Sequence, residues 1–378
     1  MDICCYRLCF SNFPSPYPPH PLIITPSSTR LYKTGNISAG GLYARDRPSD
    51  IAKSVQGNAV KAGKRQQLSG LYYSTKEDKI LKNLSILTKT YVLQPIILFF
   101  LLVPSSHAED LFFDSDGVKI HYTMEGEGEP VLLLHGLTGS SQQFMRTGIM
   151  KEISSSFKTI AMDIRGHGKS DKPHDPEAYG ISFIQDPIRL LNHLGIRKTH
   201  VVGISMGGLI TTAILAYYPE RVRSAVLGSA GWVPPSMAPL GLDGAELAES
   251  IEQGKGMGAL IAALTPVGAP PRSAEQVENI SNMMLFRNDP LALSALFRNF
   301  VPSPTRDQIV SNKIPVLALI GELDPMKDSV DRLVNLMPNF KTIVIPGAGH
   351  GDAPRDPLFI ENIMAFLAEH SHVTSKTR

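Results

Sequence analysis

The sequence predicts an α/β fold, in which a mostly parallel central sheet carries helices on both faces and a helical cap is inserted between two strands. Three observations lead to this prediction. Short apolar runs alternate with helix-length segments from Asp110 onward, as in parallel sheets. Polar, glycine-containing segments follow several of these runs, where ligands bind in such sheets. Residues 232–306 interrupt the alternation and contain no good strand.

The expected strands are short and rich in apolar or β-branched residues, which suits strands covered on both faces. They span residues 118–122, 131–134, 159–162, 200–204, 225–227, 316–320 and 342–345. Helix-length segments lie near residues 142–155, 181–194, 207–218, 329–337 and 356–369. Short cap helices are expected at residues 242–253, 257–264, 274–285 and 290–300. We therefore expect residues 109–378 to form one domain with an inserted cap.

The first 108 residues differ from the main body in charge and in cysteine content. They hold 13 Lys and Arg against 5 Asp and Glu, whereas residues 109–378 hold 24 against 30. An acidic main body argues against a nucleic-acid partner. All three cysteines, Cys4, Cys5 and Cys9, lie in the first part, so the main body has no disulfide, cysteine nucleophile or thiolate metal site.

Two kinds of leader precede the main body. Residues 1–78 are rich in Pro, Ser and Gly, and we interpret them as a disordered leader or a targeting segment. Residues 79–108 have the layout of a secretory signal, with lysines before the apolar run 96–103 and small residues before Ala108. The run is shorter than the ~18 residues that favour a spanning helix. We expect cleavage after Ala108 and export, to the periplasm or outside the cell, without stable membrane insertion. An uncleaved membrane anchor is the alternative.

A signal normally begins a chain, and this one does not. One explanation is a misplaced start, so that residues 1–78 are absent from the native protein. The other is a bipartite leader, in which residues 1–78 are a transit peptide and the protein reaches an organelle lumen. The sequence leaves both explanations open.

A serine at the apex of a strand–turn–helix segment carries the most specific chemical signal. Residues 203–207 read Gly-Ile-Ser-Met-Gly, after the apolar run 199–202 and before the helix-like run 208–216. A G-x-S-x-G motif in this context predicts a strained turn that exposes Ser205, and only small residues fit two positions away on either side. The helix N-terminus next to the serine favours negative charge.

An acid and a histidine follow later strands. Glu322 and Asp324 compete as the carboxylate that orients a histidine, and the turn at Pro325 favours Asp324. His350 lies between glycines after the last strand, in a loop that can aim its imidazole. The order Ser205, Asp324, His350 along an alternating α/β chain is a specific indication of a catalytic triad.

The other polar segments are expected to have supporting roles. The turn after the strand 131–134 offers the N–H of Leu137, which with the N–H of Met206 could bind an oxyanion. We expect His135 to pin this turn. Residues 163–170 could form a metal or phosphate loop, but they lack a second histidine or an acid cluster. We therefore expect Asp163 and Arg165 to be hydrogen-bonded inside that loop.

With these motifs, residues 110–370 resemble the α/β-hydrolase superfamily, in its branch of capped, single-domain serine hydrolases. The matching segments are His135-Gly136, residues 163–170, residues 203–208, residues 321–324 and Gly349-His350. The resemblance implies that Ser205 is the nucleophile, His350 the general base and acid, and Asp324 the orienting carboxylate. It implies no metal or organic cofactor. It does not extend to residues 1–108.

The expected activity is hydrolysis of small or medium, mainly apolar carboxylic esters through an acyl-enzyme. The cap is apolar and has few basic residues, so we expect it to line a cavity of roughly 300–1,000 Å³ that prefers uncharged substrates. The apolar cap residues are Trp232, Met237, Leu240, Leu242, Met257, Leu260, Leu264, Met283, Met284, Leu285 and Phe286. We expect about a third of these side chains to line the cavity and the others to pack the cap onto the core. Carbon–carbon bond hydrolysis, perhydrolysis or haloperoxidation by the same triad is an alternative, and a ligand-binding receptor on this scaffold is another. Ser205 argues against relatives that use an aspartate nucleophile. The sequence does not set the oligomeric state.

Overall fold

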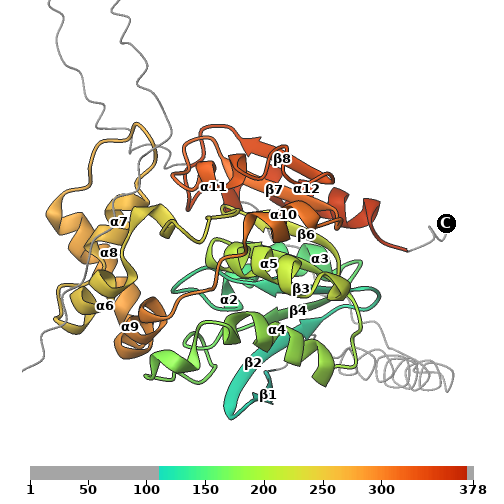
Figure 1. The fold of residues 1–378 in the computed structure, drawn as a ribbon, viewed down its shortest axis with the longest axis horizontal. Coiled ribbons are helices and arrows are strands. Elements are labelled where there is room, and N and C mark those ends of the chain that lie inside the picture. Colours follow the sequence, from blue (N-terminus) through green and yellow to red (C-terminus); the bar gives the residue numbers. More distant parts are fainter. Residues whose placement is uncertain (1–109, 373–378) are drawn as a thin grey trace, which may run out of the picture. The chain divides into compact units, whose positions relative to one another are not determined.

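The protein is described here from a computed structural model, which covers residues 110–372 (Figure 1). The expectations for residues 1–78 and for the signal at residues 79–108 lie outside the described residues. Within residues 110–372, no helix is long and apolar enough to cross a membrane.

The sheet confirms the predicted α/β architecture and adds one strand. Its eight strands are β1 (Leu111–Ser115), β2 (Val118–Glu125), β3 (Pro130–Leu134), β4 (Lys158–Met162), β5 (Thr199–Ile204), β6 (Val222–Gly228), β7 (Val316–Gly321) and β8 (Phe340–Ile345). They lie in the order β1-β2-β4-β3-β5-β6-β7-β8. β2 is antiparallel to both of its neighbours, and β3 to β8 are parallel. The sequence did not predict β1, which has buried side chains only at Phe113 and Ser115 and pairs with β2 alone along the sheet edge.

Helices cover both faces of the sheet. One core cluster includes side chains of α4 (Ser182–His193), α5 (Met206–Tyr217), α10 (Arg306–Ser311) and α11 (Lys327–Asp331). The other includes side chains of α2 (Gln142–Arg146), α3 (Ile149–Ser154) and α12 (Pro357–Glu369). Successive residues of β5 divide between the two clusters, with Val201 in the first and Val202 in the second, as the two-residue period of a strand requires.

Two of the expected helices are shorter than predicted. The segment 142–155 forms α2 and α3, which are separated at Gly148, where φ is 79° and the helix cannot continue. The segment 329–337 is helical only in α11, and Asn335 beyond it also has a positive φ of 66°. Positive φ is compatible with a turn but not with an α-helix, and Asn tolerates it better than most residues.

Besides α10, the segment between β6 and β7 contains α6 (Gly244–Glu252), α7 (Gly258–Ala263), α8 (Ala274–Phe286) and α9 (Pro290–Arg298). Figure 1 shows them grouped at one end of the sheet, in yellow to orange. α6 packs against α9 and α7 against α8. Asp243, Ser273 and Asp289 cap the N-termini of α6, α8 and α9 with side-chain hydrogen bonds. These four helices form the cap above the carboxyl ends of the parallel strands.

Candidate active site

Ser205 occupies a strained turn between β5 and α5. Its φ of 54° and ψ of −115° lie outside the regions that residues other than glycine normally adopt. A Cβ on Gly203 would lie 2.1 Å from the carbonyl oxygen of Gly207, and one on Gly207 would lie 2.0 Å from that of Leu134. The N–H of Ser205 donates to the carbonyl of Gly228 at 2.7 Å. The crowding therefore requires glycine at both positions.

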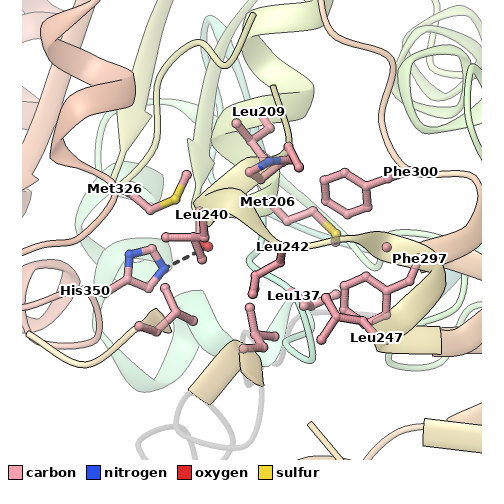
Figure 2. Close-up of a pocket in the computed structure, with 16 residues that line it drawn as sticks. Leu137, Met206, Leu209, Leu240, Leu242, Leu247, Phe297, Phe300, Met326 and His350 are labelled. Carbon is pink, nitrogen blue, oxygen red and sulfur yellow. Dashed lines mark hydrogen bonds between the residues drawn. The ribbon is translucent and has the colours of Figure 1, made fainter. Parts of the chain in front are cut away.

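The structure brings Ser205, His350 and Asp324 together. Nε2 of His350 lies 2.9 Å from Oγ of Ser205, the contact drawn as a dashed line in Figure 2. Nδ1 of His350 lies 3.0 and 3.1 Å from the two carboxylate oxygens of Asp324. A carboxylate accepts but does not donate, so Nδ1 carries the proton and Nε2 is free to accept the serine proton. The arrangement can activate the Ser205 hydroxyl as a nucleophile.

The two candidate carboxylates after β7 have different surroundings. The Asp324 side chain is fully buried and accepts the N–H of Met326 at 2.9 Å as well as facing His350. The Glu322 side chain is exposed and accepts the N–H of Gly347 at 2.8 Å. The structure thus places Asp324, and not Glu322, against the imidazole.

The two nominated N–H donors flank the serine. Leu137 and Met206 line the same cavity as Ser205 and His350. A Cβ on Gly136 would lie 3.3 Å from the Cβ of Ser205, so the loop after β3 passes directly beside the nucleophile. Within residues 110–372, neither the Leu137 nor the Met206 N–H donates to a protein acceptor. Both N–H groups are available to an oxyanion. The N–H of Met206 also lies at the N-terminus of α5, where the positive end of the helix dipole stabilises negative charge.

His135 pins the loop after β3. Its side chain is fully buried, Nδ1 donates to the carbonyl of Gly136 at 2.8 Å, and Nε2 accepts the N–H of Ile164 at 3.0 Å. Burial lowers the pKa of His135, so the ring is neutral and can accept that N–H. The ring does not contact Ser205 and has the supporting role expected of it.

Asp163 organises the loop after β4. It accepts the N–H groups of Ser141 and Lys169 at 2.6 and 2.7 Å, and its side chain lies 2.8 Å from Nδ1 of His121. Burial alone would raise the pKa of Asp163, but these hydrogen bonds and the nearby His135 hold that pKa well below its ordinary value. Asp163 is therefore hydrogen-bonded within the loop, as expected.

The expectation for Arg165 was wrong. Its Nε and Nη2 each donate to Asp186 of α4 at 2.6 Å, and its Nη1 donates to the carbonyl of Ala178. Ser115 of β1 donates to the same carboxylate at 2.5 Å. Asp163 already fills the interior of the loop, so the guanidinium reaches outward to a buried acid. Asp186 was missed because a lone acid within an amphipathic helix gives no sign that it is buried.

A cavity of about 200 Å³ lies beneath the cap at Ser205 and His350 (Figure 2). Apolar side chains of the core and of the cap line it. They include Met206, Leu209 and Met326 from the core, with Leu240, Leu242, Leu247, Leu260, Leu264, Phe297 and Phe300 from the cap side. The cavity is thus apolar as predicted but smaller than expected.

Four of the eleven apolar cap residues, Leu240, Leu242, Leu260 and Leu264, line this cavity, and none of the cap methionines does. Met257 is fully buried in the core, Met283 is largely exposed, and Met237 and Met283 are absent from the lining. Phe286 is 91% exposed. The methionines that do line the apolar cavity, Met206 and Met326, belong to the core.

A second cavity, of about 600 Å³, adjoins the first and shares Leu137, Ser205, Leu260, Leu264 and His350 with it. Its lining is more polar and includes Arg146 and Arg355. The sequence reasoning considered only the cap as a pocket wall and missed both arginines, which lie on α2 and after His350. Within residues 110–372, no group of three or more His, Cys, Asp or Glu side chains could hold a metal ion.

Comparisons with known proteins support the fold. Residues 129–249 match the family model described as alpha/beta hydrolase fold. The chain is 27% identical over 271 residues to a putative 2-succinyl-6-hydroxy-2,4-cyclohexadiene-1-carboxylate synthase of Bacillus subtilis, covering 67% of this chain and 96% of that protein. It is 26% identical over 268 residues to an uncharacterized carboxylesterase, nap, of the same organism, covering 64% of this chain and 80% of that protein. The solved esterase RhEst1 from Rhodococcus has the same fold, with a TM-score of 0.53, 23% identity, and coverage of 70% of this chain and 99% of that one.

Proposed function

Because the chain belongs to the α/β-hydrolase superfamily, we propose that it is a serine hydrolase that cleaves carboxylic esters through an acyl-enzyme. One observation carries the proposal: the hydrogen-bonded series from Ser205 through His350 to the buried Asp324, opening onto an apolar cavity. The names of a carboxylesterase and an esterase among the similar proteins support ester chemistry.

The proposed reaction has two steps. Nε2 of His350 takes the Ser205 proton while Oγ attacks the ester carbonyl, and the N–H groups of Leu137 and Met206 stabilise the oxyanion. His350 then passes the proton to the leaving oxygen. Water, activated by the same imidazole, hydrolyses the acyl-enzyme. Asp324 keeps the imidazole in the required tautomer and stabilises its protonated form.

The apolar cavity supports a small acyl group. A volume of about 200 Å³ suits a short acyl chain rather than a long fatty acid, and the surrounding leucine and phenylalanine side chains offer no partner for a charge. We therefore propose short, uncharged acyl groups as the acyl part of the substrate.

Carbon–carbon bond cleavage by the same triad is a second candidate. One of the similar proteins, of which the chain covers 96%, is named as a synthase, so the similarity is not confined to proteins named as esterases. Ser205 and His350 could serve either chemistry, so substrates must separate the two.

The test is a substrate panel on the full chain beside Ser205→Ala. The panel comprises p-nitrophenyl esters from acetate to octanoate and a vinylogous diketone. We expect the highest kcat/KM for the short esters, and loss of at least about 10³-fold in Ser205→Ala. Turnover of the diketone alone would favour carbon–carbon cleavage. Absence of any Ser205-dependent turnover would overturn the proposal.

A further inference from the structure

The polar cavity beside the catalytic pair carries positive charge that no group among the described residues 110–372 neutralises. Arg146 is the last residue of α2, and Arg355 is the last residue of a short 3-10 helix, η4 (Ala353–Arg355). Both line the cavity of about 600 Å³, and its lining contains no Asp or Glu. Within the described residues 110–372, neither arginine forms an ion pair. The cavity therefore has two cations and no carboxylate.

The hydrogen-bonding capacity of these arginines is largely unused. Nη1 of Arg355 donates to the carbonyl of Gly351, which ties the side chain to the loop that carries His350. Among residues 110–372, Arg146 donates to no protein acceptor. A guanidinium presents five N–H groups in a planar fork that matches a carboxylate, so most donors on both side chains are available to a ligand.

The two cavities differ in what they can accept. The cavity beneath the cap is lined by apolar side chains and would leave a charge unsolvated. The polar cavity offers Arg146, Arg355, Gln143 and Thr147. After acylation, water must replace the leaving group beside His350, and a polar cavity admits water readily. The acyl group therefore fits the apolar side, and the leaving group fits the polar side.

We propose that the polar cavity binds the leaving alcohol of the substrate and that Arg146 and Arg355 hold a carboxylate on that alcohol. This inference rests on the proposed ester hydrolysis. The substrate class is then an ester of a short apolar acid with a hydroxy carboxylic acid. Water adds across the ester bond: the acyl group leaves as a free acid, and the leaving oxygen takes the Ser205 proton through His350, which releases the hydroxy carboxylate. This departs from the preference for uncharged substrates expected from the sequence, because that expectation considered the basic residues of the cap and both arginines lie outside the cap.

The experiment compares matched substrates. One is the butyrate ester of 3-hydroxybenzoate, and the other is the butyrate ester of 3-hydroxybenzamide, which has the same shape without the charge. The full chain should hydrolyse the carboxylate ester with a kcat/KM roughly tenfold or more above that of the amide, as charge-assisted hydrogen bonds predict. The ratio should fall as ionic strength rises. Arg146→Gln and Arg355→Gln should each lower the ratio, and the double variant should bring it close to one.

Arg306→Gln is the matched control, because Arg306 is exposed and lines neither cavity. It should leave the ratio unchanged. Ser205-dependent turnover of both esters with a ratio near one in the unmodified chain would overturn the carboxylate site while leaving ester hydrolysis intact. The site would also be overturned if the protein preferred the phenyl monoester of a dicarboxylic acid, which carries the carboxylate on its acyl part, over the butyrate ester of 3-hydroxybenzoate. Absence of Ser205-dependent turnover of either ester would instead refute the proposed function.

Discussion

The direction of the chain at Pro325 decides which of two neighbouring carboxylates meets His350. In an extended strand Glu322 and Asp324 would point to the same side, because residues two apart share a face. The turn separates them, so that Asp324 is buried against the imidazole while Glu322 accepts the N–H of Gly347 at the surface. A single proline beside the pair thus allowed the correct carboxylate to be selected from sequence.

This difference predicts unequal effects of removing each negative charge. Asp324→Asn should lower kcat by orders of magnitude, because an amide at that position favours the wrong tautomer of His350. Glu322→Gln should change kcat by less than about threefold, since its partner is a backbone N–H of an exposed loop. Ser205→Ala and His350→Ala should be as severe as Asp324→Asn or more so, and the losses should not add in double variants.

Steady-state kinetics on the best ester of the panel gives these values, and circular dichroism checks that each variant is folded. A severe Glu322→Gln variant beside a mild Asp324→Asn variant would reverse the assignment of the two acids.

The positions of other functional side chains could not be predicted from the sequence. Arg146 and Arg355 are far apart in the chain, and nothing in their spacing shows that α2 and η4 border the same cavity. Arg165 was assigned to the wrong partner for the same reason, because Asp186 reaches it only through the packing of α4 on the sheet. Motifs that lie within one strand–loop segment could be predicted, whereas contacts between segments depend on tertiary packing.

At the scale of elements, the β5–turn–α5 unit forms because its small residues let two backbones approach closely. Gly203 faces the carbonyl of Gly207 and the Thr211 hydroxyl, and Gly207 faces the carbonyl of Leu134 on the neighbouring strand. Thr211 in turn donates its hydroxyl to the Gly207 carbonyl at 2.7 Å. The turn is thereby fixed by strand β3 on one side and by helix α5 on the other.

Gly207→Ala should therefore destabilise the fold severely. Its Cβ would lie 2.0 Å from the backbone oxygen of Leu134, which cannot move without disturbing the central strand β3. We expect a loss of about 3 kcal/mol or more in the free energy of unfolding, or failure to fold. Gly258→Ala is the control, because its Cβ would meet only the Val277 side chain at 3.4 Å and its φ is ordinary. That change should stay within about 1 kcal/mol.

Urea denaturation of both variants measures the difference. Equal free energies of unfolding for Gly207→Ala and Gly258→Ala would show that the turn is not as crowded as the geometry indicates.

At the scale of the whole molecule, the alternation of strand and helix signals was sufficient to predict the layers of the sheet. It did not predict β1, a five-residue strand, Leu111–Ser115, that pairs with β2 alone at the edge of the sheet. Nor did it predict how much space the cap leaves over Ser205. That volume depends on the way in which α6 packs on α9 and α7 on α8, and short amphipathic helices carry little information about their mutual packing.

Buried histidines tie the stability of the whole molecule to pH. Burial, with a smaller effect from the nearby His135, lowers the pKa of His167 to about 3. Burial also lowers the pKa values of His135 and His200. Nδ1 of His167 donates to the carbonyl of Arg165, and its Nε2 has no partner among residues 110–372. All three rings are neutral in the folded protein near pH 7.

The sign of the effect follows from proton linkage. An unfolded histidine takes up a proton near pH 6.5, whereas folded His167 does not do so until about pH 3. Between these values the unfolded state binds more protons, so the free energy of unfolding falls as the pH falls, by at most about 1.4 kcal/mol per pH unit for His167. His121 acts in the opposite direction. Burial alone would lower the pKa of His121, but hydrogen bonds to Asp163 and Asp110 raise it above its ordinary value. Folded His121 therefore binds its proton more tightly than the unfolded chain does, and its contribution to the free energy of unfolding is retained in acid.

We therefore expect the free energy of unfolding to fall between pH 6.5 and pH 5, which urea denaturation at a series of pH values would measure. His167→Asn keeps a side-chain donor for the Arg165 carbonyl but removes the titrating ring, so its slope over this range should be smaller by about 1 kcal/mol per pH unit. His372→Gln replaces an exposed histidine and should keep the slope of the unmodified protein. The comparison uses slopes, so a constant loss of stability in His167→Asn does not affect it. Identical slopes in all three proteins would mean that His167 titrates in the folded state as it does in the unfolded chain.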